Sequence, residues 1–270
     1  MRRALFINKQ RRIELQTSEL FPKIHRQATP GDLASYKEEV GYVMDQYANL
    51  CGTQVADYLE DKAILEVGCG GRASGILALI GYRPRSITAI DLSPENVRLT
   101  REASSMLDHP RISVMVGNAL NLEFEDNQFD FVFSDGVIHH TVNMRKCFSE
   151  LRRVLKSAGC LLLGVYGYGG VFGHVIHPAG MLAGKVIPLK WMEALVNTTG
   201  IGRSQDYSLL DWLYTPVQEK HSAKELRGWF AEEGFEDVAI LRSPKWPFQL
   251  GVLSNTLFGD GYIYAMAKKR

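Results

Sequence analysis

The chain has 270 residues, which is enough for one domain with insertions or for a domain with a small cap. Its 46% hydrophobic and 23% charged residues are ordinary for a globular protein, and a formal charge of +1 gives no support to a broad nucleic-acid surface. From this charge we expect no nucleic-acid partner. The four cysteines (Cys51, Cys69, Cys147 and Cys160) lie far apart without metal-ligand spacing, so we expect them to be reduced thiols.

We expect no secretory signal at the amino end. It lacks the apolar run that such a signal needs. The most hydrophobic long stretch, 171–189, is interrupted by histidines, prolines and a lysine, which makes it too polar for a membrane span. We therefore expect a cytoplasmic protein with no membrane span. Five basic residues within positions 2–12 are expected to form a solvated, partly disordered tail, with a contact to RNA or lipid as the alternative.

A glycine-rich loop follows the first predicted strand. Residues 33–59 have helical periodicity with a break at Gly52 and lead into a strand at 63–67. Gly68 and Gly70 then permit a sharp turn close to a bound group, and a helix at 72–80 would offer its free amides to that group. The loop fits the dinucleotide pattern G-x-G-x-x-A, whereas Glu66, two residues before the first glycine, favours another nucleotide-like cofactor.

Strands and helices alternate after this loop with short connections. Further strands are expected at 86–90, 112–116, 129–133 and 160–165, and helices at 93–107 and 143–155. Strands separated by helices predict a parallel sheet covered on both faces, with ligands bound at the carboxyl ends of the strands. Gly68, Asp91, Asn118 and the pair Ser134–Asp135 would all lie on that edge.

The alternation breaks between 166 and 220, a stretch rich in glycine, proline and aromatic residues. It resumes with a helix at 222–234, which starts in a capping box, and two strands at 235–241 and 262–267 that suggest an antiparallel pair. The predicted fold is an α/β, Rossmann-like, doubly wound sheet of seven mostly parallel strands with an antiparallel last strand, helices on both faces and a lid insertion. The expected units are a helical lead-in or cap at 1–60, a core at 61–166 and 221–270, and a lid that binds the acceptor at 167–220.

Two side chains on the predicted edge suit a nucleoside. Asp91 ends a strand, where its carboxylate can accept hydrogen bonds from both hydroxyls of a ribose. Asn118 offers an amide donor and acceptor to an adenine edge. Turn chemistry is the alternative for both, because aspartate and asparagine cap helices and fit tight loops. Glu66, beneath the loop, can orient loop amides and favour a cationic amino-acid tail.

The chain resembles the class I S-adenosylmethionine-dependent methyltransferases that act on small molecules. The resemblance rests on Glu66-Val-Gly-Cys-Gly70, on Asp91 followed by Leu-Ser-Pro, on Gly117-Asn-Ala119, and on the segments 129–140 and 150–159, and it extends from about residue 36 to 269. The late Glu-Glu-Gly-Phe235 with its two closing strands is also typical. Arg72 departs from the family, which usually has glycine there, and we expect its side chain to face solvent.

The resemblance implies S-adenosylmethionine as the cofactor and S-adenosylhomocysteine as its product. The implied cofactor-binding residues are Glu66, Gly68, Cys69, Gly70, Asp91, Leu92, Asn118, Ala119 and Ser134. A general base is needed for many oxygen acceptors, and the candidates are His139 and His140 after strand four and His174 in the lid, followed by His177 and His221. A structural or surface role is the alternative for each histidine. The segment after the predicted strand at 160–165 supplies no Asp-Asn metal pair, so no metal is expected.

The expected reaction is methyl transfer to an oxygen or nitrogen of a small, partly apolar acceptor, such as a secondary metabolite, a quinone or a lipid-linked compound. The aromatic insertion favours an apolar acceptor pocket beneath a lid. Two alternatives stay open: use of the cofactor without methyl transfer, as in cyclases or as a structural ligand, and a nicotinamide dehydrogenase. A homodimer is also left open.

Overall fold

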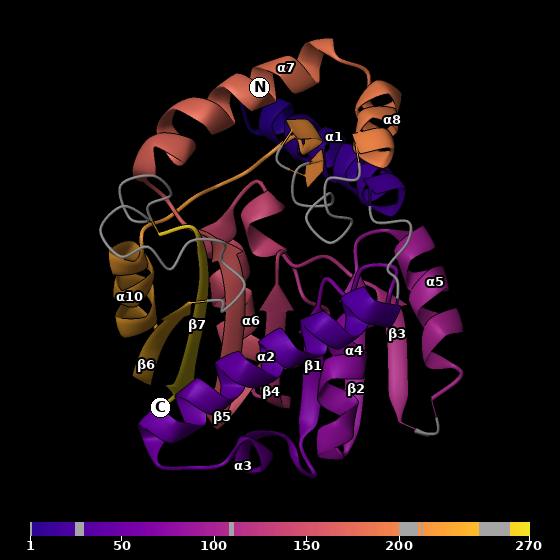
Figure 1. Cartoon of the computed structure of the whole chain (residues 1–270). Coiled ribbons are helices and arrows are strands. Elements are labelled where there is room, and N and C mark those ends of the chain that lie inside the picture. The colour runs from indigo at the N-terminus through magenta and orange to yellow at the C-terminus, as the bar shows by residue number, and fades with distance from the viewer. Residues whose placement is uncertain (1, 25–29, 108–110, 200–209, 212, 243–259) are drawn as a thin grey trace.

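The computed structural model describes residues 2–24, 30–107, 111–199, 210–211, 213–242 and 260–270 (Figure 1). Seven strands form one mixed sheet in the order β3-β2-β1-β4-β5-β7-β6. Their bounds are β1 (Ala63–Val67), β2 (Ser86–Asp91), β3 (Ile112–Val116), β4 (Phe129–Asp135), β5 (Leu155–Tyr166), β6 (Phe235–Arg242) and β7 (Tyr262–Lys269). The first five strands are parallel, and β7 runs antiparallel to both β5 and β6. The predicted fold class is confirmed.

Helices cover both faces of the sheet, as the alternation of elements predicts. One face is covered by α2 (Pro30–Cys51), α3 (Val55–Leu59), α4 (Ser74–Leu79) and α5 (Pro94–Ser104). The other face is covered by α6 (Met144–Val154) and α10 (Ala223–Glu232). Three short helical turns complete these connections: η1 (Ile80–Tyr82), η2 (Ile138–His140) and η3 (Phe172–Ile176).

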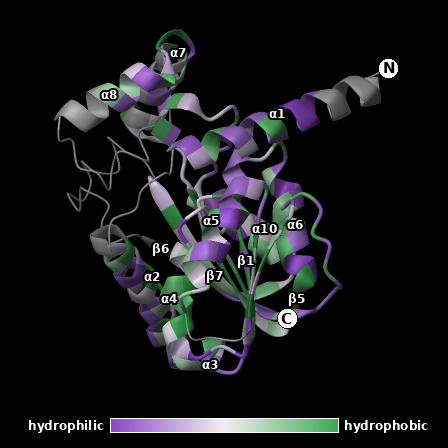
Figure 2. Ribbon diagram, turned by 90° about the vertical axis from the view of Figure 1, so that its right-hand side faces the viewer, coloured by the Kyte–Doolittle hydropathy of each residue, from purple (hydrophilic) through white to green (hydrophobic). Residues whose placement is uncertain are grey.

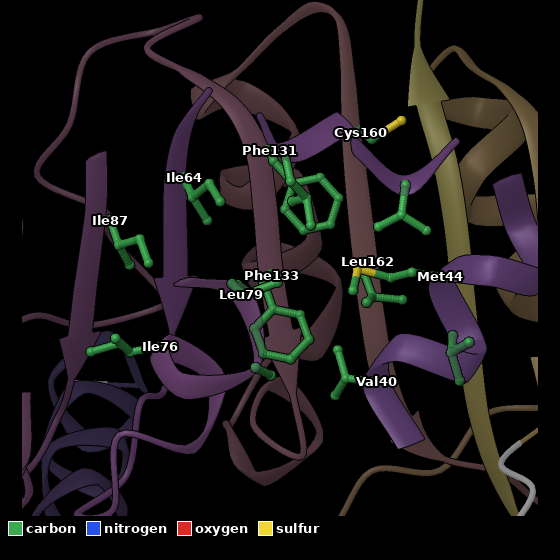
Figure 3. Close-up of a cluster of buried hydrophobic side chains, with 14 of the residues drawn as sticks. Val40, Met44, Ile64, Ile76, Leu79, Ile87, Phe131, Phe133, Cys160 and Leu162 are labelled. Atoms are coloured by element: carbon green, nitrogen blue, oxygen red, sulfur yellow. The ribbon is translucent and has the colours of Figure 1, made fainter. Parts of the chain in front are cut away.

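Two apolar layers hold the sheet between its helices. On the α2 side, Val40 and Met44 of α2 pack with Phe131, Phe133 and Leu162 of the central strands (Figure 3). On the α6 side, a second buried cluster joins the strands to α6 and α10. Figure 2 shows the hydrophobic residues gathered on the strands between the two helix layers. The carboxyl ends of the parallel strands are thereby held in fixed register, which positions the loops that follow them.

A third group of helices lies beyond the carboxyl edge of the sheet. It comprises α1 (Arg2–Ile24), α7 (His177–Val186) and α8 (Leu189–Thr199), which lie together at one end of the molecule (Figures 1 and 2). The prediction of a partly disordered basic tail is wrong, because Arg2–Ile24 forms a helix of 23 residues. Strong helix formers fill this segment, and Glu14 and Phe21 fasten it to the sheet edge through Asn118 and His140.

Several predicted boundaries shift. Strand β5 begins at Leu155, so residues 156–159, predicted to connect a helix to a strand, already belong to the strand. They form an irregularity in it, where the pairing with β4 changes register and Ala158 adopts a φ of 61°. Helix α4 starts at Ser74 instead of residue 72, after Ala73 in the left-handed conformation. Gly52 breaks the 33–59 helix as predicted, with a φ of 66°. The capping box at Ser222 is confirmed.

Candidate active site

The predicted site residues of the first four strands meet at the carboxyl edge of the sheet. Glu66 lies in β1 and Asp91 ends β2, and these strands are neighbours. Gly68, Cys69 and Gly70 form the turn after β1, while Asn118 and Ala119 follow β3. Leu92 follows Asp91, and the buried Ser134 is the penultimate residue of β4. The structure therefore brings together the nine residues that sequence reasoning assigned to a cofactor.

The glycine loop is tied to the neighbouring strand by backbone bonds. The amides of Gly68 and Cys69 both donate to the carbonyl of Ile90, at 2.8 and 3.0 Å. Gly68 has a φ of 83°, and a Cβ there would overlap Val137 and lie 2.7 Å from its Cγ1. Gly70 has a φ of 61° and no atom within 4 Å of a Cβ, so its space lies open. The first glycine is needed for close packing and the second for its left-handed backbone conformation.

Asp91 organises the loop from the end of β2. Its Oδ2 accepts a hydrogen bond from the Gly70 amide at 2.9 Å. Its Oδ1 accepts from the Ser93 amide at 2.8 Å and from the Asn96 side chain at 3.1 Å. Burial raises the pKa of Asp91, although these three bonds oppose the shift. A carboxylate has about four acceptor positions, so one position on Oδ2 is left for a ligand hydroxyl.

Glu66 is buried beneath the loop, and its partners differ from the prediction. The carboxylate accepts the backbone amides of Gly75 and Ile76, at the start of α4. These amides were expected to face the bound group, but they are already satisfied by Glu66. Burial, together with the nearby Asp91 and Asp135, raises the pKa of Glu66 to about 8. Its Oε2 has no hydrogen-bond partner among the described residues, so a cationic ligand group would find an acceptor there.

Asn118 shows the turn chemistry that was the alternative to an adenine contact. Its Oδ1 accepts from the Leu120 amide at 2.9 Å, and its Nδ2 donates to Glu14 of α1 at 3.2 Å. Helix α1 therefore lies directly over the end of β3.

Arg72, predicted to face solvent, is half-buried in the turn before α4.

The histidine pair after β4 divides into two different environments. His139 is fully buried and its ring lies 4.1 Å from that of His140 and 4.2 Å from that of Tyr166. Neither ring nitrogen of His139 has a partner among the described residues. Burial, His140 and Lys220 all lower its pKa well below the usual value, so His139 is neutral at pH 7.

His140 is held by two acceptors. Its Nε2 lies 3.1 Å from Oδ2 of Asp211, and its Nδ1 lies 3.1 Å from the carbonyl oxygen of Val217. Both ring nitrogens of His140 therefore have a polar partner, and the tautomer decides which of them donates. Tyr166 donates to the same carboxylate oxygen at 2.8 Å. This buried cluster joins the core to the segment after α8, and it removes His140 as a candidate base.

The remaining histidines lie apart from this pair. His174 is exposed in η3, with its Nδ1 3.3 Å from the hydroxyl of Tyr168. His177 bonds Gln218 at 2.6 Å, and the His221 ring lies 4.5 Å from that of Trp229. The described contacts join none of the three to His139.

Sequence reasoning placed Asp135 on this edge but missed the tyrosines that surround its carboxylate near Glu66. Asp135, at the end of β4, accepts hydrogen bonds from Tyr36 at 2.8 Å, Tyr264 at 3.1 Å and Tyr262. A Cβ at Gly164, between the strands, would overlap Asp135 and lie 2.9 Å from the Tyr262 hydroxyl. Burial raises the pKa of Asp135 to about 6. The i, i+2 spacing of the two β7 tyrosines was a usable signal, because it places both on one face.

Comparison with known proteins identifies the central domain. Residues 65–163 match a family model described as a methyltransferase domain. Phosphoethanolamine N-methyltransferase 2 of Caenorhabditis elegans is 34% identical over 115 residues, which are 42% of this chain, and the chain spans only 26% of that relative's length. Demethylmenaquinone methyltransferase of Bacillus cereus is 23% identical over 74% of this chain and 78% of its own.

The solved structures agree at the level of the fold. A Haemonchus contortus phosphoethanolamine N-methyltransferase 2, solved with phosphomonomethylethanolamine and S-adenosylhomocysteine, matches with a TM-score of 0.54 at 17% identity, over 83% of this chain and 52% of its own. Residues 65–163 therefore carry a methyltransferase domain, and the sheet has the fold of the solved methyltransferases. The cofactor of this methyltransferase family is S-adenosylmethionine.

The residues of the methyltransferase domain fit this cofactor. The site has an acceptor position on Asp91 for a ribose hydroxyl and an unpartnered oxygen on Glu66 for an ammonium group. Buried polar atoms normally have partners, yet Ser134 Oγ and both nitrogens of His139 have none among the described residues. Four unpartnered atoms at one edge match a polar ligand bound there. No described helix is long and apolar enough to cross a membrane.

Proposed function

We propose that the protein transfers the methyl group of S-adenosylmethionine to an oxygen or nitrogen of a small, partly apolar molecule, such as a secondary metabolite, a quinone or a lipid-linked compound. The observation that carries the proposal is the buried, unpartnered His139, two residues after the Val137 that packs on Gly68, at an edge where Asp91 fastens the glycine loop. The match to a demethylmenaquinone methyltransferase over most of this chain supports a quinone-like acceptor among these classes.

The cofactor supplies an electrophilic methyl group on its sulfonium. Asp91 and the glycine loop would hold the nucleoside, and Glu66 would hold the cationic amino-acid end. His139 is neutral, so one ring nitrogen can accept the proton that an acceptor hydroxyl loses as its oxygen attacks. Helix α1 and the lid at 167–220 close the edge against water, which protects the reaction from competing solvent.

We further infer the roles of the predicted units. Residues 61–166 and 221–270 form the cofactor-binding core, while 1–60 and 167–220 supply helices that cover it. The small-molecule acceptor, the cytoplasmic location and a homodimer stay predictions. The contacts of α1 with Asn118 and His140 support its role as part of the cover.

Calorimetry with S-adenosylhomocysteine tests the cofactor site, and product mass tests the reaction. We expect binding by the folded protein and, with a panel of quinols, phenols and amines, a product heavier than its acceptor by one CH2 group. Cofactor binding with an unmethylated product would favour the alternative use of the fold without methyl transfer. A folded protein that binds neither the cofactor nor its product would refute the proposal.

A further inference from the structure

Helix α7 and the turn η3 before it expose apolar side chains to solvent. Val171 directly precedes η3, Val175 lies in η3, and Leu182 and Val186 lie in α7, so these four residues recur at helical spacing. Their exposed fractions are 46%, 61%, 65% and 77%. A surface helix of a globular protein normally buries such a stripe and exposes its polar face. This outer stripe, defined by the four residues, is therefore inverted.

The body-facing side of the same helix fixes this orientation. Gly180 and Gly184 face Leu213: a Cβ on Gly180 would lie 3.0 Å from Leu213 Cδ2, and one on Gly184 would overlap the Leu213 carbonyl oxygen. His177 is buried and bonds Gln218 at 2.6 Å. Rotation of the helix to bury the outer stripe would break this bond and drive side chains into the Leu213 backbone. The outward orientation is built into the packing.

A tryptophan and two lysines border the outer stripe. Trp191, at the start of α8, is 68% exposed, and Ile187, which lies between α7 and α8 in the sequence, is 37% exposed. Lys185 and Lys190 are both exposed beside them. Helix α7 contains no acidic residue. An apolar row with a tryptophan and flanking lysines is the composition of helices that lie in the interface of a lipid bilayer.

We propose that the outer stripe, with Trp191, Lys185 and Lys190, docks the protein on the surface of an anionic lipid bilayer. The apolar side chains would enter the boundary between headgroups and acyl chains, and the lysines would pair with lipid phosphates. A second copy of the chain is the less favoured occupant, because a symmetric contact would bring the same lysines together with no acidic residue of α7 to pair them.

The position of the stripe agrees with this partner. Helices α7 and α8 lie at the end of the molecule beyond the carboxyl edge of the sheet, together with α1 (Figures 1 and 2). Exposed Lys9, Arg11 and Arg12 of α1 add positive charge at that end. If the proposed methyl transfer is correct, a docked molecule would carry its active site close to lipid-linked acceptors; the docking itself does not depend on that reaction.

Co-sedimentation of the full chain with vesicles tests the proposal without cofactor or acceptor. We expect binding to vesicles of phosphatidylcholine with a quarter phosphatidylglycerol, and weaker binding to phosphatidylcholine alone. Replacement of Lys185 and Lys190 by alanine should lower the anionic partition coefficient by about fivefold for each lysine. The double variant Leu182→Gln/Val186→Gln should lower it by at least about tenfold, because it removes two of the inserting side chains.

Leu50→Gln/Met106→Gln is the matched control. Leu50 is 70% exposed and Met106 is 87% exposed, and neither belongs to η3, α7 or α8. This control should bind vesicles as the wild type does. The proposal is wrong if the wild type fails to bind anionic vesicles, or if the lysine variant and the Leu182→Gln/Val186→Gln variant both bind as well as the wild type does. It is also wrong if Leu182→Gln/Val186→Gln abolishes a dimer in sedimentation velocity without any change in vesicle binding. Methyl transfer assayed separately distinguishes a failure of docking from a failure of the proposed function.

Discussion

Glu66 holds its proton at a pH where glutamates are normally ionised, because burial and two neighbouring aspartates raise its pKa to about 8. The folded protein therefore binds this proton more tightly than the unfolded chain does. Stability from this group is complete below the ordinary pKa of 4.5 and is lost as the pH rises toward 8. We expect the melting temperature of the cofactor-free protein to fall between pH 5 and pH 8.

Glu66→Gln is the variant that isolates this contribution. The amide keeps an acceptor for Gly75 or Ile76 but cannot ionise, so the decline of the melting temperature should become shallower. Asp135, whose pKa of about 6 is also raised by burial, retains its own share of the decline below pH 7. An unchanged slope in Glu66→Gln would show that Glu66 is already ionised in the folded state.

The same proton gives the cofactor a calorimetric signature. An ammonium group beside Glu66 would stabilise the carboxylate and lower its pKa, so binding of S-adenosylhomocysteine at pH 7 should release a proton. The apparent enthalpy should then vary with the ionisation enthalpy of the buffer, and this variation should disappear in Glu66→Gln. Equal buffer dependence in both proteins would place the proton elsewhere.

His139 and His140 differ in what their ring nitrogens can do. His139 is buried, neutral and without a described partner, whereas His140 is occupied by Asp211 and Val217. For an oxygen acceptor, His139→Gln should lower kcat by about 10²- to 10⁴-fold and change the affinity for S-adenosylhomocysteine little. His221→Gln is the control and should keep kcat within a factor of two. A normal kcat in His139→Gln would leave the histidine with a packing role only.

At the scale of elements, the start of α4 depends on the absence of a side chain at Gly75. A Cβ there would overlap the Glu66 carboxylate and lie 2.8 Å from Phe133 Cε1. Gly75→Ala should therefore destabilise the fold by about 1–3 kcal/mol and weaken cofactor binding, because the helix start and loop must shift together. Urea unfolding and calorimetry measure the two effects.

Gly228→Ala is the matched helical control. It lies within α10 and a Cβ there would meet nothing within 4 Å. Alanine is the better helix former, so this change should stabilise the protein by about 0.5–1 kcal/mol and leave cofactor affinity unchanged. Equal destabilisation by both variants would argue against a special role for Gly75.

At the scale of the whole molecule, the lid at 167–220 contacts the core through the buried pair of His140 and Asp211. Asp211→Asn replaces the buried carboxylate that contacts both His140 and Tyr166, and a buried polar group left without its partner costs about 1–3 kcal/mol. We expect faster hydrogen exchange in residues 213–219 and a raised KM for the acceptor, with a smaller change in S-adenosylhomocysteine affinity. Asp126→Asn, which breaks an exposed pair with Arg153, should change neither.

The fold could be predicted because its signals are local. The apolar runs, the glycine stops and the Ser93 and Ser222 caps each mark an element boundary within a few residues, and alternation then implies a parallel sheet. The partners of the site residues could not be predicted in this way. Asp211 meets His140 across 71 positions, and Tyr36 meets Asp135 across 99, so only tertiary packing brings these groups together.

The structure of the N-terminal segment could not be predicted either, because it also depends on contacts between residues far apart in the sequence. Its charges suggest a solvated tail, and its helix is fixed by contacts made far along the chain, from Glu14 to Asn118 and from Phe21 to His140. Asn118 was assigned to a ligand from its position after a strand, but one of its amide atoms caps a turn and the other bonds Glu14. Position along a strand predicts the neighbourhood of a side chain better than its partner.

The reversed direction of β7 gives the molecule two functionally different ends. Because β7 runs against β5, Lys268 pairs with Cys160, and the chain reaches Arg270 at the edge opposite the glycine loop (Figure 1). A strand of eight residues spans about 25 Å, so this distance separates a probe on Arg270 from the carboxyl edge. Immobilisation through that residue would present α1, α7 and the active site to solution in one orientation, whereas an extension before α1 would emerge beside the cap.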